Sequence, residues 1–129
     1  MGKRYLIDSN VIIDYTGSLL PTKGSDFVEQ LFNADFLISV AVKIEVLGFD
    51  DVPTKLEAME EFVETAKILP LDEAVTKQTI LLRRKHKKLK LGDAIIAATA
   101  LVNSLIIISR NRKDFDNIEG LECIDPYSL

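Results

Sequence analysis

Residues 93–109, DAIIAATALVNSLIIIS, place an almost wholly apolar helix directly before an apolar strand. In the first part, 94–102, only Thr99 is polar, and 105–108 contains no polar residue. Uninterrupted apolar strands are typical of parallel sheets, because helices cover both faces of such sheets. This stretch therefore predicts an α/β fold with a buried parallel sheet.

The rest of the chain alternates in the same way. Each expected strand is a short apolar run: 4–7, 36–40, 67–69, 105–109 and 122–124. The expected helices are about 25–32, a segment carrying Glu45 and ending near Gly48, 53–66, 73–88 and 93–103, with a short helical turn at 11–13. Their expected start signals are Ser25 or Gly24 as N-cap, Thr54 with Glu57 as a capping box, Asp72 as N-cap, and a break at Gly92.

Length and composition predict one domain over residues 1–129. The chain has 129 residues, of which 47% are hydrophobic and 28% are charged, as in water-soluble globular proteins. No apolar run approaches the roughly 20 residues that cross a bilayer, so we expect no membrane contact. The single cysteine, Cys123, excludes an internal disulfide and fits a cytoplasmic protein in which it is a core residue.

Net charge is −4, but the charges are unevenly distributed. Residues 83–113 hold nine Lys or Arg against one acid, whereas the remainder holds seven against nineteen. A polyanion needs a positive face rather than a positive protein. A solvated helix end explains residues 83–90 about as well, but Arg110, Arg112 and Lys113 follow a different strand and add to the same sign. Both interpretations stay open.

Three acids are expected at one edge of the sheet. Asp8 follows the first strand, Glu45 lies in the helix after the second, and Asp93 opens the apolar helix. Open α/β sheets bind ligands outside the carboxyl ends of their strands. Carboxylates gathered there repel one another unless a cation lies between them, so the pattern predicts a metal site.

The ligand type indicates Mg²⁺ or Mn²⁺, which prefer oxygen ligands, rather than zinc, because the chain has one His and one Cys. A metal held in this way makes hydroxide available near neutral pH and polarises a phosphoryl oxygen. Two ions about 4 Å apart would instead clamp the attacking and leaving oxygens of a displacement. The residues do not choose between one ion and two. Taken singly, each acid also suits a structural role as a turn, exposed helix or N-cap residue.

Four segments resemble, in order, the motifs of the PIN-domain family, and in length and order those of its VapC-type toxin ribonucleases. The segments are 6–14 (LIDSNVIID), Ile38-Ser39 with Glu45, 90–100 (KLGDAIIAATA) and 108–115 (ISRNRKDF), followed by 118–121 (IEGL) and Pro126. The resemblance spans essentially the whole chain. It implies a three-layer α/β/α domain with a five-stranded parallel sheet.

The resemblance also implies Mg²⁺- or Mn²⁺-dependent cleavage of RNA, transfer RNA being a common target of similar toxins. It further implies a homodimer and inhibition by a cognate antitoxin. By matching positions, Asp8, Glu45 and Asp93 would be the metal carboxylates, and Ser9 and Asn10 would orient Asp8 and a bound water.

Two positions depart from the family pattern. The fourth acid is replaced by Asn111, whose amide still offers an oxygen but no charge, and Asp114 would substitute for it if that segment is helical. Val42 stands where a hydroxyl residue is usual, which removes an expected helix cap before Glu45.

The basic residues then acquire an expected role. Lys90, Arg110 and Arg112 flank Asp93 and Asn111 and would grip RNA phosphates, and His86 would face phosphate rather than act as a base. The main alternative is a catalytically weakened PIN domain, altered at the fourth acid position, that binds RNA or its antitoxin without cutting. An aspartate-nucleophile phosphatase fits less well because Asn10 stands where a second Asp is usual, and a phosphoreceiver domain lacks its adjacent acid pair.

Overall fold

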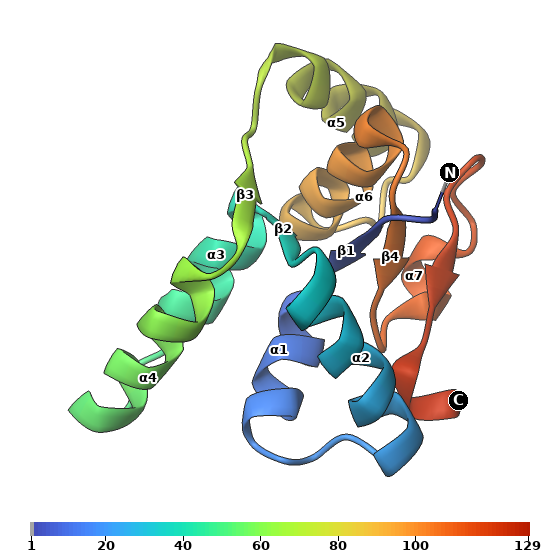
Figure 1. Cartoon of the computed structure of the whole chain (residues 1–129). Coiled ribbons are helices and arrows are strands. Elements are labelled where there is room, and N and C mark those ends of the chain that lie inside the picture. The colour runs from blue at the N-terminus through green and yellow to red at the C-terminus, as the bar shows by residue number, and fades with distance from the viewer. Residues whose placement is uncertain (1) are drawn as a thin grey trace.

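The computed structural model describes residues 2–129, and strands alternate with helices along them (Figure 1). The strands are β1 (Tyr5–Ile7), β2 (Leu37–Ser39), β3 (Lys67–Leu69), β4 (Ile106–Ile108) and β5 (Cys123–Ile124). The helices are α1 (Ser9–Thr16), α2 (Thr22–Ala34), α3 (Val40–Leu47), α4 (Pro53–Glu64), α5 (Glu73–Lys85), α6 (Leu91–Asn103) and α7 (Arg112–Phe115), with a 3₁₀ turn η1 (Pro126–Ser128).

All strand pairs are parallel, as predicted, but they form two sheets. One sheet has the order β1-β4-β5 and the other pairs β2 with β3. The expectation of one five-stranded sheet is therefore not met. Strand β2 lies next to β1, yet no ladder joins them in residues 2–129. Strands β1 and β2 have three residues each, and the three residues of β2 pair with β3 instead.

The parallel register of β1 and β4 places the start of the chain beside its last third. Tyr5 pairs with Ile106 and Ile7 with Ile108, and the backbone N–H of Asp8 continues the ladder by donating to the carbonyl of Ile108 at 2.9 Å. The residues that directly follow these two strands are therefore neighbours, although about 100 positions separate them.

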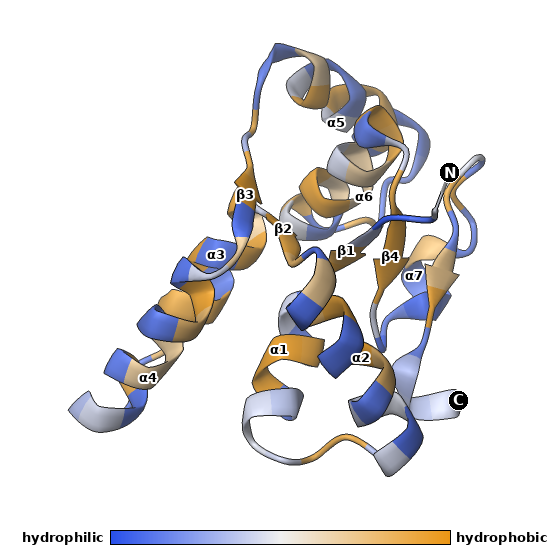
Figure 2. Ribbon diagram, viewed as in Figure 1, coloured by the Kyte–Doolittle hydropathy of each residue, from blue (hydrophilic) through white to orange (hydrophobic). Residues whose placement is uncertain are grey.

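Helices lie on both sides of these strands. Helix α6 packs on β2 and β4, with α5 against it, whereas α1 and α2 lie on the other side of the strands in the view of Figure 1. Helices α3 and α4 form a pair that extends away from the sheets. The strands and the sides of the helices that face them are the most hydrophobic parts of the ribbon (Figure 2). The largest fully buried side chain is Phe115, and Cys123 belongs to the same core, as predicted.

Two predicted helix caps are wrong, although α4 begins at Pro53 as expected. Helix α2 begins at Thr22, with Pro21 as its N-cap in an extended backbone conformation; the Pro21 carbonyl accepts from the N–H of Ser25, so neither Ser25 nor Gly24 is the N-cap. Instead, Gly24 lies against η1, where a side chain would collide with the backbone of Pro126. Helix α4 starts after Val52 without a side-chain cap, which leaves no capping box at Thr54.

Other boundaries shift by a few residues. Helix α1 is a full helix from Ser9 rather than a short turn, α5 ends at Lys85 rather than Lys88, and Asp72 caps α5 as expected. Helix α6 starts at Leu91, so Gly92 lies inside it rather than before it. No helix in the described chain is both long enough and apolar enough to cross a bilayer.

Candidate functional site

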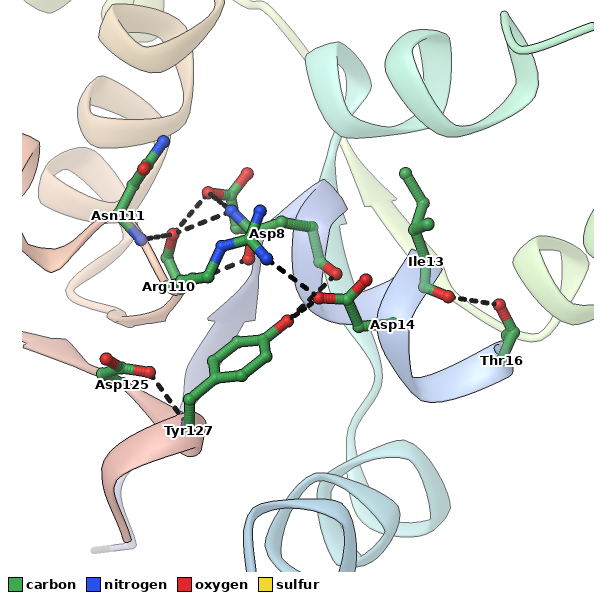
Figure 3. A network of polar contacts seen from close by, with 10 residues as sticks. Asp8, Ile13, Asp14, Thr16, Arg110, Asn111, Asp125 and Tyr127 are labelled. Atoms are coloured by element: carbon green, nitrogen blue, oxygen red, sulfur yellow. Dashed lines mark hydrogen bonds and ion pairs between the residues drawn. The ribbon is translucent and has the colours of Figure 1, made fainter. Parts of the chain in front are cut away.

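Asp8 is the centre of a buried polar network at the carboxyl end of β1 (Figure 3). Its side chain is 2% exposed and caps α1, with Oδ1 accepting from the backbone N–H of Ser9 at 2.8 Å. Its Oδ2 accepts from Asn10 Nδ2 at 3.2 Å and from Ser109 Oγ at 2.6 Å. Ser9 and Asn10 thus contact and orient Asp8. Because a carboxylate offers about four acceptor sites, Oδ1 keeps capacity for a further partner.

Ser109 is a residue of this network that the sequence alone did not single out. While its hydroxyl donates to Asp8, it accepts from the backbone N–H of Asn111 at 2.9 Å and from Asn10 Nδ2 at 3.3 Å. One donor and two acceptor positions are all that a hydroxyl has, so Ser109 is fully used. The signal that would have found it is a polar residue directly after the apolar strand β4.

Glu45 and Asp93 come from helices α3 and α6, which contact each other. Ser39 ends β2 and caps α3, its Oγ accepting from the N–H of Val42 at 3.2 Å. The cap expected to be missing at Val42 is therefore supplied by Ser39. Asp93 lies in the first turn of α6, as predicted, where the helix dipole favours a negative charge. A Cβ built on Gly92 would lie 3.4 Å from Glu45 Oε2, so α6 approaches the Glu45 carboxyl closely.

Neighbouring acids contribute, after burial, to the raised pKa values of Glu45 and Asp93. Burial raises the pKa of Asp8, and hydrogen bonds from Ser109, Ser9 and Asn10 partly offset this effect. Glu45 is exposed as a residue, but partial desolvation of its carboxyl, followed by repulsion from Asp8 and Asp93, raises its pKa. Desolvation, then repulsion from Asp8 and another acid, also raises the pKa of Asp93. A positive ion among these groups would relieve the repulsion.

The carboxyl groups do not form a ready-made coordination shell. Within residues 2–129, no group of three or more Asp, Glu, His or Cys side chains is gathered as a metal cluster. The donors are nevertheless hard oxygens, and Mg²⁺ typically keeps several waters while binding one or two carboxylates. The donor set therefore fits such a hydrated ion better than a fully protein-ligated one.

At the position of the family's fourth acid the chain has Asn111, and Asp114 follows three residues later. Asn111 precedes α7 and is anchored through its backbone N–H on Ser109, while its side chain is exposed. The segment after it is helical, and Asp114 lies in its first turn, where it raises the pKa of Asp93. Asp114 is therefore close enough to add negative charge to the group.

Two of the expected phosphate-binding residues are in ion pairs within the chain. Arg110 lies 3.3 Å from Asp14, over the ring of Tyr127, whose hydroxyl donates to the same Asp14 carboxylate (Figure 3). Arg112 pairs with Asp116 at 3.2 Å. The third expected residue, Lys90, immediately precedes α6, and its charge lowers the pKa of Asp93.

Several known proteins are similar to this chain in sequence and in structure over almost its whole length. Ribonuclease VapC1 of Rickettsia felis is 26% identical over 129 residues, covering 95% of this chain and 96% of its own. A toxin–antitoxin complex from Klebsiella pneumoniae has a chain that is 28% identical, with a TM-score of 0.78 over 97% of this chain and 99% of that one. VapBC2 of Rickettsia felis, solved with a fragment of promoter DNA, shares the fold at 18% identity and a TM-score of 0.78, over 93% and 96% of the two chains.

The family assignment follows from the extent of the match. The family model described as PIN domain matches residues 5–121, which contain β1 to β4, all the helices α1 to α7 and each of the acids described above. The chain therefore belongs to the PIN-domain family.

Proposed function

We propose that this chain is a metal-dependent endoribonuclease, the toxin of a VapBC-type toxin–antitoxin pair. One observation carries the proposal: besides burial, the charge of Asp8 raises the pKa values of both Glu45 and Asp93, so the three carboxyl groups are near one another, in a PIN domain similar over 95% of its length to Ribonuclease VapC1. PIN-domain nucleases generally depend on divalent metal ions. The reaction would be hydrolysis of an RNA phosphodiester bond.

Asp8, Glu45 and Asp93 would hold Mg²⁺ or Mn²⁺, with Asp114 as an additional acid near Asp93. Bound there, the metal would supply an activated water and an electrophile for the phosphoryl oxygen. The chain keeps Asp8 in place through three hydrogen-bond donors, which fixes the orientation of its free oxygen sites. Asn111 would contribute its amide oxygen at the edge of the group.

The remaining residues of the proposed site bind substrate or prepare the carboxylates. The backbone N–H of Ser9 donates to Asp8 Oδ1 at 2.8 Å, and the Ser9 side chain lowers the pKa of Glu45, so Ser9 lies between two of the acids and would help to set their distance. Asn10 accepts from the backbone N–H of Arg110 at 3.2 Å and so connects α1 to the loop after β4. Lys90, Arg110 and Arg112 would contact RNA phosphates, the two arginines by exchanging Asp14 and Asp116 for a phosphate.

Cleavage of RNA by the purified chain tests this function. With Mn²⁺, the wild-type chain should cut structured RNA, including transfer RNA, and chelation of the metal should stop the reaction. Asp8→Asn and Asp93→Asn should abolish cleavage while circular dichroism shows an unchanged fold. Equal cleavage by the wild type and both variants would contradict the proposal, because contaminating nuclease would then explain the activity.

A second candidate function is an RNA- or antitoxin-binding module without catalysis. It is favoured by Asn111, which carries no charge where the family pattern has an acid, and by the lack of a three-residue metal cluster in the described residues. Asn111→Asp separates the two functions. If the missing charge limits catalysis, this variant should cleave faster than the wild type with the same metal. A binding module would stay inactive after this single change.

We also propose that the chain acts in the cytoplasm as a homodimer that a cognate antitoxin inhibits. The exposed apolar side chains on α5 and α6 supply a surface that a second copy would cover, with a hollow lined in part by Leu71, Ile80, Leu91 and Ile95. Light scattering should give the mass of two chains, and Ile80→Glu should reduce it to one. A short reading frame next to the coding sequence is the expected source of the antitoxin.

A further inference from the structure

A second hollow, of about 430 Å³, opens beside Asp93 between the segment after α5 and the helix α7. Four of its lining residues are lysines and two are acids. We call it the lysine hollow, and these residues are Lys87, Lys88, Lys90, Lys113, Asp93 and Asp114. It therefore joins the basic segment of the chain to the carboxyl groups of the proposed metal site.

The four lysines of the hollow are available for an external anion. In the described part of the chain, four basic side chains form salt bridges with acids: Arg4, Lys85, Arg110 and Arg112. None of the hollow's lysines is among them, although two acids line the same hollow. Arg110 and Arg112, by contrast, must first release a carboxylate. A phosphate beside Asp93 can therefore contact the lysines of the hollow without first displacing a carboxylate from a salt bridge.

We propose that the lysine hollow binds the phosphodiester backbone of the RNA strand next to the bond that is cut. This inference rests on the ribonuclease function proposed above and adds the place where the strand lies. A phosphate that approaches Asp93 meets the repulsion of several carboxylates. Four lysines within the same hollow offset this repulsion, because unlike charges a few ångströms apart attract strongly near a protein surface.

The lining of the hollow indicates that it binds phosphates rather than bases. Among the residues described that line it, His86 supplies one aromatic ring, and none is Phe, Tyr, Trp or Arg. Base recognition on single strands depends on aromatic or guanidinium planes for stacking, and the hollow offers one such ring beside four lysines. Lysine acts on phosphate as a point charge, and phosphate contacts position a strand without selecting its sequence. The contribution of the hollow should therefore be equal for RNAs of different sequence.

Counterion release gives the size of the expected effect. Each phosphate contact contributes about 0.7 to the slope of log K against log salt for a single strand. Removing three lysines should therefore reduce the magnitude of this slope by about 2. If the variant and the unsubstituted protein bind equally at 1 M salt, the variant should then bind about a hundredfold more weakly at 0.1 M salt.

The test compares two triple substitutions in the Asp8→Asn background, so that binding is measured without cleavage and without metal. Affinity is read by fluorescence anisotropy with two single-stranded RNAs of unrelated sequence, each at several salt concentrations. The hollow variant combines Lys87→Gln, Lys88→Gln and Lys113→Gln. The control variant makes the same charge change at exposed lysines on other helices, Lys23→Gln, Lys55→Gln and Lys77→Gln.

The hollow variant should lose about a hundredfold in affinity at 0.1 M salt for both RNAs, and the control variant less than threefold. Equal losses in the two variants, or a loss confined to one RNA, would overturn the proposal. So would unchanged RNA affinity together with lost affinity for polyglutamate, which would indicate an acidic protein segment as the occupant. If the triple variant misfolds, Lys88→Gln and Lys113→Gln are tested singly, with about a fivefold loss expected for each.

This design separates the two proposals. The expected binding result together with an inactive wild-type chain would reject the nuclease function and retain the hollow as an RNA site. Cleavage by the wild type with equal binding by both triple variants would retain the nuclease and reject the hollow.

Discussion

Ser109→Ala removes the hydroxyl that connects Asp8 to the loop after β4. The lost hydrogen bond, 2.6 Å from Ser109 Oγ to Asp8 Oδ2, is a short bond to a carboxylate with 2% exposure, so water does not readily replace it. The backbone N–H of Asn111 loses its acceptor in the same change. A hydrogen bond to a charged group contributes about 1.5–3 kcal/mol, and a neutral one about 1 kcal/mol.

The loss of stability should therefore grow with pH. The Ser109 hydroxyl lowers a pKa that burial has raised, so the variant has a still higher folded-state pKa at Asp8. The variant then holds the proton more tightly when folded, and its stability relative to the wild type falls as pH rises through the two folded-state pKa values. We expect a loss of about 1 kcal/mol where Asp8 is protonated and about 2–3 kcal/mol where it is ionised.

Thermal unfolding at several pH values measures this difference, with a shift of the midpoint of roughly 6–10 °C expected at the alkaline end. The acid limb of the pH profile of cleavage should move to higher pH, because only ionised Asp8 is competent. Thr79→Val is the matched control, since Thr79 is a buried hydroxyl that donates to the backbone carbonyl of Val75 rather than to a carboxylate. A loss independent of pH in Ser109→Ala, with an unmoved cleavage profile, would refute the reasoning.

Three further substitutions test the surroundings of the acids. Glu45→Gln should abolish cleavage yet raise the free energy of unfolding at pH 7 by up to about 1 kcal/mol. The reason is that a carboxyl whose pKa is raised in the folded state destabilises the fold most when it is ionised. Equal stability of the variant and the wild type at pH 4, with a more stable variant at pH 8, would support this. Gly92→Ala should favour α6 by about 0.5–1 kcal/mol but press on the Glu45 carboxyl, so cleavage should fall while the unfolding midpoint rises; unchanged cleavage would argue against that contact. Gly24→Ala should lower the free energy of unfolding by about 3 kcal/mol or more, because the added Cβ would collide with the backbone of Pro126. Faster proteolysis at the C-terminus would report that η1 has detached.

Much of the fold was accessible from the sequence because the deciding signals are local. Residues 67–69 were predicted as a strand and form β3 with the same bounds, and Asp72 caps α5 as expected. The start of α2 was missed because Pro21, rather than a hydroxyl side chain, begins the helix. The split into two sheets was also missed, since no pattern in a three-residue strand reports whether its neighbour lies within ladder distance.

The sequence also determined which residues are candidates for chemistry. The order of the motifs around Asp8, Glu45 and Asp93 indicated the PIN family, and the positions of Asp8 directly after a strand and of Asp93 near a helix start follow from periodicity and capping within a few residues. Such signals act over one or two turns of chain. They can therefore be identified without knowing which segments later lie side by side.

Only the tertiary structure decided how these residues are connected. Ser109 reaches Asp8 because the register of β1 and β4 brings together positions 101 residues apart, and the same register brings Arg110 to Asp14. The lysine hollow likewise depends on the approach of α7 to the segment after α5. Contacts of this kind depend on strand register and helix packing, which are set by the burial of the whole core and leave no signal in a local stretch of sequence.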